Sequence, residues 1–204
     1  MTGARQQPSY SLYKNVSRPG FDTFLLTEYL GTLSPGTLLD MGTGTGYIAI
    51  MATQNRWQCT AVDNSLQACN AAKDNAQENG VSFPVVYSDL FSKVSGVFDC
   101  IAFNPPYGYS KQGGALQGIL ETIKSWIPRD NRLFAEAAFL LVRKQRKELI
   151  TRFLDSASAY LKKDGVVLLL LHHSEIPFVC ARYPGKVVGS ARWMRLISIP
   201  AESL

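Results

Sequence analysis

The chain has 204 residues, of which 46% are hydrophobic and 18% are charged, and its formal net charge is +5. This length and composition suit one domain with a sizeable core and exclude an intrinsically disordered protein, while the basic charge is compatible with a nucleic-acid or ribosomal partner. The polar first residues hold no secretory signal and the longest apolar run, 166–171, is too short to cross a bilayer, which indicates a cytoplasmic protein without membrane contact.

Short apolar runs alternate with helical stretches along the chain. Buried strands are expected at 36–42, 57–63, 83–89, 97–104 and 166–173, helices at 47–55, 64–80 and 150–165, and a terminal hairpin at 185–199. Uniformly apolar strands that alternate with helices indicate a parallel sheet covered on both faces. Ligands of such sheets bind beyond the carboxyl ends of the strands, so functional residues are expected directly after each strand.

The four cysteines carry no motif that points to chemistry. They stand at Cys59, Cys69, Cys100 and Cys180, and none forms a Cys-x-x-Cys pair. The sequence therefore predicts neither a zinc site nor a redox motif, and we expect reduced thiols and no bound metal.

The first strand ends in LLDMGTGTGYIAI, where Gly42, Gly44 and Gly46 are spaced by single residues. This spacing permits a tight turn and a close approach of the backbone to a ligand, although many nucleotide-binding folds share it. Asp40, just before the turn, would repel a pyrophosphate but suits a cationic ligand. S-adenosylmethionine carries an ammonium and a sulfonium group, so Asp40 and the three glycines are predicted to bind this cofactor. The alternative for Asp40 is a helix cap.

Acidic residues also end the second and third strands. Asp63, with Asn64 beside it, lies 23 positions after Asp40 (63 minus 40), where an acid can accept hydrogen bonds from both ribose hydroxyls. Asp89 can accept from the adenine amino group, with Leu90 packed on the ring. Capping and turn roles are alternatives for each acid alone, but acids at three consecutive strand ends favour a cofactor site.

The fourth strand ends in Asn104, Pro105, Pro106 and Tyr107. The two prolines fix two φ angles and remove two N–H donors, which leaves the carbonyls of Asn104 and Pro105 free to face a ligand. An amine on a planar carbon, such as adenine N6 or a carboxamide nitrogen, needs two acceptors, which the Asn104 side-chain oxygen and the Pro105 carbonyl can supply. Tyr107 can stack on the flat group. These four residues are predicted to bind the acceptor, and Asn104, Pro105 and Tyr107 to catalyse its methylation by positioning and electrostatics.

These motifs resemble those of class I S-adenosylmethionine-dependent methyltransferases that act on amino groups. They are most similar to the HemK-type protein-glutamine methyltransferases, especially the short form without an N-terminal helical domain, over roughly residues 16–107 and again around the fifth strand. The resemblance implies an α/β fold with a Rossmann-like, seven-stranded sheet, mostly parallel, with a C-terminal antiparallel hairpin and helices on both faces.

The segment VSRPGFDTFLLTEYL resembles the family's segment before the first strand. By this resemblance Thr23 contacts the carboxylate end of the cofactor, with Pro19 and Phe24 near it. Positions that match the family's cofactor and catalytic residues are Asp40, Gly42, Asp63, Asp89 and Asn104. Residues 1–30 are accordingly expected to form an arm and helix that pack on the cofactor site, and residues 31–204 to form the methyltransferase domain.

Residues 108–146 depart from the family pattern, because they are longer than its glycine-rich stretch and look helical after Gly114. We expect a substrate-side excursion there. The preferred acceptor is a glutamine side-chain amide in a release-factor-like protein of the translation machinery, and adenine N6 in RNA or DNA is the alternative. A further alternative is an inactive cofactor-binding subunit, which the intact Asn104, Pro105 and Tyr107 argue against. The resemblance also suggests a small activator subunit as partner.

Two further signals are weaker. The segment VRKQRKELITR, 142–152, is basic and is expected to be a solvated helix face on which Glu148 pairs locally, with phosphate contacts as the alternative. His172 and His173 follow the fifth strand without an acidic or cysteine partner at metal spacing, so we expect an edge or surface role for them.

Overall fold

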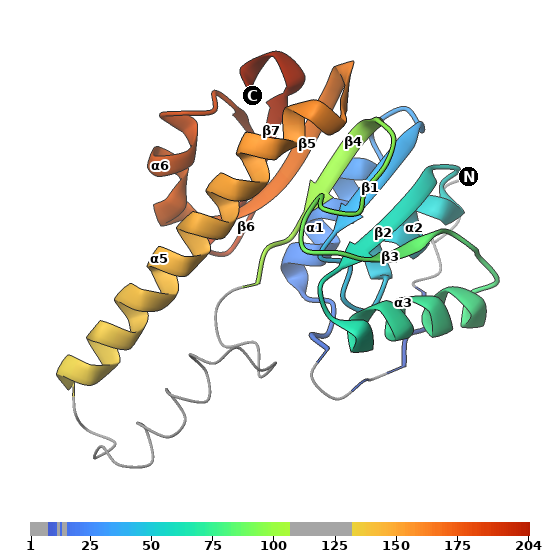
Figure 1. Ribbon diagram of the computed structural model, residues 1–204, viewed down its shortest axis with the longest axis horizontal. Coiled ribbons are helices and arrows are strands. Elements are labelled where there is room, and N and C mark those ends of the chain that lie inside the picture. Colours follow the sequence, from blue (N-terminus) through green and yellow to red (C-terminus); the bar gives the residue numbers. More distant parts are fainter. Residues whose placement is uncertain (1–7, 12, 14–15, 107–131) are drawn as a thin grey trace.

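The sheet of this protein has seven strands in the order β3-β2-β1-β4-β5-β7-β6 (Figure 1). The computed structural model describes residues 8–11, 13, 16–106 and 132–204, with the backbone alone for 132–142. The strands are β1 (Thr37–Met41), β2 (Gln58–Asp63), β3 (Val85–Tyr87), β4 (Phe98–Phe103), β5 (Leu161–His172), β6 (Lys186–Ala191) and β7 (Met194–Pro200). Pairing is parallel from β3 through β5, and β7 pairs antiparallel with β5 and β6. The predicted mostly parallel sheet with a C-terminal hairpin is confirmed.

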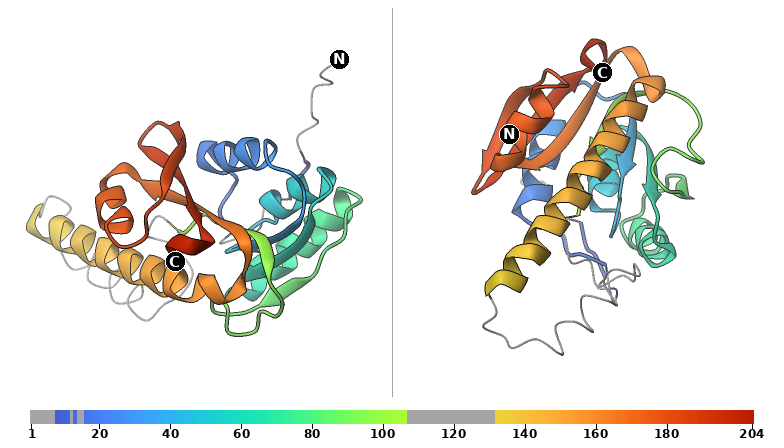
Figure 2. Two further views of the ribbon diagram at one scale, coloured as in Figure 1. Left: turned by 90° about the horizontal axis from the view of Figure 1, so that it is seen from above. Right: turned by 60° about the vertical axis from the view of Figure 1, so that its left-hand side comes forward.

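Helices cover both faces of this sheet, as predicted. They are α1 (Phe21–Leu30), α2 (Tyr47–Gln54), α3 (Leu66–Glu78), α5 (Arg132–Ala157) and α6 (Ile176–Cys180), with short 3₁₀ turns η1 (Ser158–Tyr160), η2 (His173–Glu175) and η3 (Ala201–Ser203). Figure 2 shows α5 and α1 on opposite sides of the sheet. The start of α3 is fixed locally, because the Ser65 side chain accepts a hydrogen bond from the Ala68 N–H at 3.3 Å.

Alternating residues of the central strands fill two separate cores. On β1, Leu39 and Met41 pack with α5 residues such as Phe153, while Leu38 packs with the α1 and α2 side chains, for example Leu26. The same alternation continues along β4, β5 and β7. Because successive side chains of a strand point to opposite faces, apolar residues at every position require helices on both sides.

The boundary between α5 and β5 corrects the sequence prediction. A helix was expected through Gly165, but α5 ends at Ala157 and β5 begins at Leu161. Leu161 pairs with Phe98 of β4, and Lys162 Nζ lies 2.7 Å from Asp99 Oδ2. These contacts with a distant strand hold the LKKDG segment extended, although its local composition favours a helix.

The described residues were searched for membrane-spanning helices and for metal-binding clusters. Among those residues no helix is both long and apolar enough to span a membrane, and no cluster of three or more metal-ligating side chains occurs. Cys59, Cys69 and Cys100 are buried and free, as expected of reduced thiols, and Cys180 is free and partly buried. Burial raises the pKa of the Cys59 thiol to about 12, which makes it unreactive.

Candidate active site

A cavity of about 520 Å³ opens beyond the carboxyl ends of β1, β2 and β4, beside the start of α1. Sites for small ligands usually measure roughly 300–1,000 Å³. The predicted site residues that line it are Thr23, Gly42, Gly44, Asp63, Asn64, Asp89, Leu90, Asn104, Pro105 and Pro106. Residues 16–19 of the N-terminal arm line it as well, while Asp40 and Gly46 do not. The strand ends therefore converge on one site, as the topology required.

The glycine turn after β1 links this strand to β2 and α3. The Gly44 N–H donates to Asp63 Oδ2 at 3.0 Å, which joins the turn to the end of β2. Gly46 has a φ of +81°, and a Cβ at this position would lie 3.0 Å from the Ala72 Cα of α3. Gly46 therefore allows α2 to pack closely against α3. Its direct contact with a cofactor stays a prediction.

Replacing Gly46 by alanine should lower the free energy of unfolding by about 2–5 kcal/mol, since it adds left-handed strain to a steric clash. Gly80 is the matched control, because its φ is +65° but a Cβ at this position would have no heavy atom within 4 Å. The Gly80→Ala variant should lose only the strain, about 1–2 kcal/mol. Urea unfolding measures both, and equal losses would argue against the packing role of Gly46.

Asp40 lies behind the turn and caps α2. It is fully buried, and its Oδ2 accepts hydrogen bonds from the Thr43 hydroxyl at 2.6 Å and the Ala49 N–H at 3.2 Å. Its Oδ1 has no partner within the described part of the chain. Burial raises the pKa of Asp40 to about 7, against the effect of both hydrogen bonds. The capping alternative is thus realised, and an effect of Asp40 on a cationic ligand stays a prediction.

Replacing Asp40 by asparagine should remove a pH-dependent loss of stability. Its pKa rises from 3.8 in the unfolded chain to about 7 in the folded one, so the folded protein binds more protons between these values. Stability is therefore full below pH 4 and falls as the pH rises to 7. The amide keeps an acceptor without the charge, so between pH 4 and pH 8 the variant should gain on the order of 4 kcal/mol relative to the original chain, which loses that stability over this range. Urea unfolding from pH 4 to pH 8 measures this gain, and parallel curves would contradict it.

Asp63 keeps its acceptor capacity at the edge of the cavity. Its Oδ1 accepts from the Ser65 N–H at 2.9 Å and its Oδ2 from Gly44, and it is partly buried. Burial raises the pKa of Asp63, and the backbone hydrogen bonds oppose that shift. Each carboxylate oxygen has a further lone pair, so the group can still accept from two hydroxyls. Asn64 lines the cavity beside it.

Asp89 occupies the predicted place but already has a partner. Its Oδ2 lies 2.7 Å from Nη2 of Arg152 on α5, and both side chains are more than half exposed. Such an exposed pair contributes little to stability and opens readily. Leu90 follows with a φ of +47°, and its carbonyl accepts a hydrogen bond from the Ser88 hydroxyl. Contact of Asp89 with an adenine amino group stays a prediction, for which the carboxylate keeps lone pairs beside those that face Arg152.

Asn104 is held by the first turn of α1. Its Nδ2 donates to Asp22 Oδ2 at 3.0 Å and more weakly to Thr23 Oγ1 at 3.4 Å. Because Asp22 can only accept, this contact determines which end of the amide is the nitrogen. The Asn104 Oδ1 is buried and has no hydrogen-bond partner among the residues described. Buried polar atoms are rarely left so, which makes this oxygen a candidate acceptor for a ligand hydrogen.

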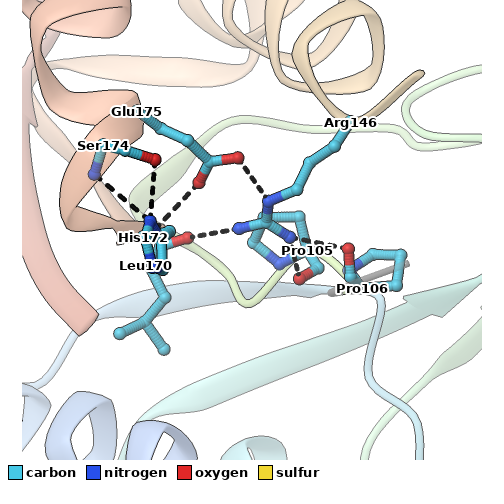
Figure 3. Close-up of polar contacts among 7 residues, drawn as sticks. All are labelled: Pro105, Pro106, Arg146, Leu170, His172, Ser174 and Glu175. Atoms are coloured by element: carbon cyan, nitrogen blue, oxygen red, sulfur yellow. Dashed lines mark hydrogen bonds and ion pairs between the residues drawn. The ribbon is translucent and has the colours of Figure 1, made fainter. Parts of the chain in front are cut away.

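Arg146 is a residue that the sequence interpretation missed. Its Nη1 donates to the carbonyls of Pro105 and Pro106, both at 2.6 Å, and its side chain is only 7% exposed (Figure 3). The prediction of a solvated helix face is therefore wrong for Arg146, although Lys144 and Glu148 do pair on that face at 4.0 Å. The prediction that the Pro105 carbonyl stands free is also wrong, because a buried guanidinium already occupies one of its lone pairs.

Tyr107 and residues 108–131 lie outside the described residues, and their predicted roles stay predictions.

His172 stands at the end of β5, where its ring lies against that of His173, and its Nδ1 is 2.8 Å from the Ser174 hydroxyl. His173 is exposed, as expected of a surface role, whereas His172 is partly buried at the carboxyl end of β5, which lies between β4 and β7.

The sheet order and the cavity at its strand ends are those expected of a class I methyltransferase. The family model described as methyltransferase small domain matches residues 17–133, and the chain belongs to this family. The expected class and cofactor are thus confirmed.

Two named relatives and one solved structure show what the chain is similar to. A putative protein N5-glutamine methyltransferase of Methanocaldococcus jannaschii is 34% identical over 160 residues, which are 78% of this chain and 73% of that protein. A release factor glutamine methyltransferase of Streptococcus pneumoniae is 30% identical over 154 residues, 74% of this chain but only 50% of that protein. The solved Mtq2–Trm112 complex of E. cuniculi has a similar fold, with a TM-score of 0.59 at 20% identity over 92% of this chain and 98% of the solved one.

Proposed function

We propose that this methyltransferase modifies the side-chain amide nitrogen of a glutamine in a protein of the translation machinery. The observation that carries the proposal is the Oδ1 of Asn104 at the end of β4, directly before two prolines, because it is buried and has no hydrogen-bond partner among the described residues. The names of the M. jannaschii and S. pneumoniae relatives support glutamine as the acceptor. The E. cuniculi complex, described as responsible for methylating the termination factor eRF1, supports a translation protein as the substrate.

The residues of the cavity fit S-adenosylmethionine. Asp63 offers lone pairs to ribose hydroxyls, and the apolar side chain of Leu90 offers a surface for the adenine ring. Thr23 and residues 16–19 lie on the wall formed by the N-terminal segment, where the family resemblance places the carboxylate end of the cofactor. When bound there, the cofactor supplies an electrophilic methyl group on a sulfonium.

Asn104 and Pro105 would position the acceptor. Asn104 Oδ1 accepts one hydrogen of the planar –NH₂ group, and the Pro105 carbonyl accepts the other on the lone pair that Arg146 leaves open. Two fixed acceptors direct the nitrogen lone pair toward the methyl carbon. With the cofactor bound, the amide nitrogen would accept the methyl group from the sulfonium and release one proton to water. This step needs acceptors in fixed places rather than a strong base.

A small partner protein is part of the proposal. The similar E. cuniculi fold was solved in a complex with Trm112. We expect a small subunit to bind this chain and raise its activity, as the family resemblance also suggests. Assays with and without lysate fractions of low molecular mass test this, and full activity of the isolated chain would contradict it.

Labelled S-adenosylmethionine identifies the acceptor directly. The chain is incubated with release factors, ribosomal proteins, RNA and DNA in separate reactions, and labelled products are digested and sequenced by mass spectrometry. We expect label on a glutamine of a release factor. Label found only in RNA or DNA would overturn the glutamine proposal in favour of adenine N6. Cofactor binding without any transfer would favour an inactive subunit.

A further inference from the structure

We propose that Arg146 is a positioning residue of the acceptor loop, where Glu175 anchors its guanidinium and the guanidinium fixes the segment Asn104–Pro106. The inference rests on the proposed function of that segment as the site of the acceptor amide. Arg146 lies on α5, 40 residues beyond Pro106 in the sequence.

The loop offers few groups by which the protein can hold it. Pro105 and Pro106 have no N–H, so their carbonyl oxygens are the backbone groups that other residues can bind. The same nitrogen of Arg146, Nη1, donates to both carbonyls at 2.6 Å, which is short for a charge-assisted hydrogen bond. One planar cation therefore fixes two successive peptide units next to Asn104.

The guanidinium is itself fixed by groups at the end of β5. Its Nε donates to Glu175 Oε1 at 2.7 Å, and its Nη2 donates to the Leu170 carbonyl at 3.3 Å (Figure 3). The other carboxylate oxygen, Oε2, accepts from the His172 N–H at 2.9 Å. Arg146 and Glu175 are only 7% and 6% exposed. Arg146 thus joins α5, the end of β5 and the loop after β4 in one buried contact.

Asn104 is consequently held from two sides. On one side its Nδ2 donates to Asp22 and Thr23 of α1, and on the other the next two residues are bound by Arg146. The direction of its Oδ1, which has no partner in the part of the chain that the structure describes, depends on both contacts. A planar acceptor must meet this oxygen and the Pro105 carbonyl together, so a small displacement of either carbonyl lowers the rate.

A purely structural ion pair would behave differently from a positioning one. Replacing both members of a buried pair by apolar residues of similar size often leaves a protein as stable as before, whereas removing one member strands a buried charge. The apolar pair of the double variant Arg146→Met, Glu175→Leu removes no packing volume of note, but it cannot donate to the Pro105 and Pro106 carbonyls. The double variant therefore separates stability from positioning.

The kinetic test compares the double variant with Arg146→Lys and with the control Lys144→Met, an exposed residue of the same helix. Unfolding midpoints, cofactor affinity by calorimetry and single-turnover rates on the acceptor that the unaltered protein labels are measured. The double variant leaves the Leu170 carbonyl and the His172 N–H without these partners, so we expect a lower unfolding midpoint. Below that midpoint it should still bind cofactor but transfer methyl about 100-fold more slowly. Arg146→Lys keeps a charge for Glu175 without the planar fork and should also be slow. The original rate in either variant would overturn the proposal.

A second readout needs no acceptor and so separates this inference from the proposed function. The side-chain amide signal of Asn104 in ¹⁵N-labelled protein is assigned by its loss in Asn104→Asp. In the double variant this signal should shift and its protons should exchange faster with water, while Lys144→Met leaves it unchanged. An unchanged signal would refute the positioning role. Failure of the original chain to label any glutamine would instead refute the proposed function and leave this result standing.

Discussion

Replacing Asn104 by alanine should lower the rate of methyl transfer about 10²–10³-fold, as loss of one preorganised polar group does in other enzymes. Cofactor affinity should change little, because Asp63 and the glycine turn supply the main predicted contacts on the other side of the cavity. The variant loses the one buried side-chain oxygen of the cavity wall that has no partner among the described residues, together with the hydrogen bond to Asp22. Calorimetry measures binding, and single-turnover assays measure transfer.

Asn70 provides a matched control for this experiment. It is an exposed residue in the middle of α3, so Asn70→Ala removes the same side chain without touching the cavity. It should keep both affinity and rate. Unaltered turnover in Asn104→Ala would reject the catalytic role of this residue, and a loss of cofactor binding equal to the loss of rate would assign it to the cofactor instead.

Much of the fold could be predicted because its central strands are mostly apolar on both faces and because helix ends carry local signals such as Ser65. The extended conformation of the segment around Lys162 could not be predicted from such local signals. Its composition favours a helix, but Leu161 pairs with Phe98 and Lys162 pairs with Asp99, more than 60 positions away. Pairing with a distant strand overrides local propensity, and a single sequence carries no direct record of it.

The site, like the fold, was predicted where it follows from strand ends and was missed where it depends on contacts between distant residues. Residues that directly follow strands converge on the cavity, because parallel strands place their carboxyl ends at one edge. The sequence shows the position of Asp40 but not its depth, so the complete burial of this carboxylate behind the turn could not be predicted. Arg146 was misjudged as one of a run of charges, although it stands four residues before the buried Ile150 and so on the same helix face. This spacing was the one sign in the sequence that Arg146 is buried. Nothing in the sequence indicated its partner, because Glu175 lies 29 residues away.

Replacing Asp63 by alanine should weaken binding of S-adenosylmethionine about 100-fold, which corresponds to two lost hydrogen bonds to a charged group at roughly 1.5 kcal/mol each. The carboxylate also holds the Gly44 and Ser65 N–H groups, so its removal loosens the glycine turn as well. Calorimetry with the cofactor and with its demethylated product measures the change. Urea unfolding shows whether the loosened turn lowers stability as well as affinity.

Asp89→Ala separates the ribose assignment from a general effect of negative charge at the strand ends. Asp89 is more than half exposed and paired with Arg152, so its removal deletes one acceptor that is already engaged and should weaken binding less than Asp63→Ala does. At saturating cofactor, Asp63→Ala should recover most of its transfer rate, because the acceptor groups at Asn104 are untouched. A larger effect from Asp89→Ala would move the principal cofactor contact to the end of β3. A rate that saturation does not restore would mean that Asp63 also shapes the acceptor side, through the turn that it holds beside β4.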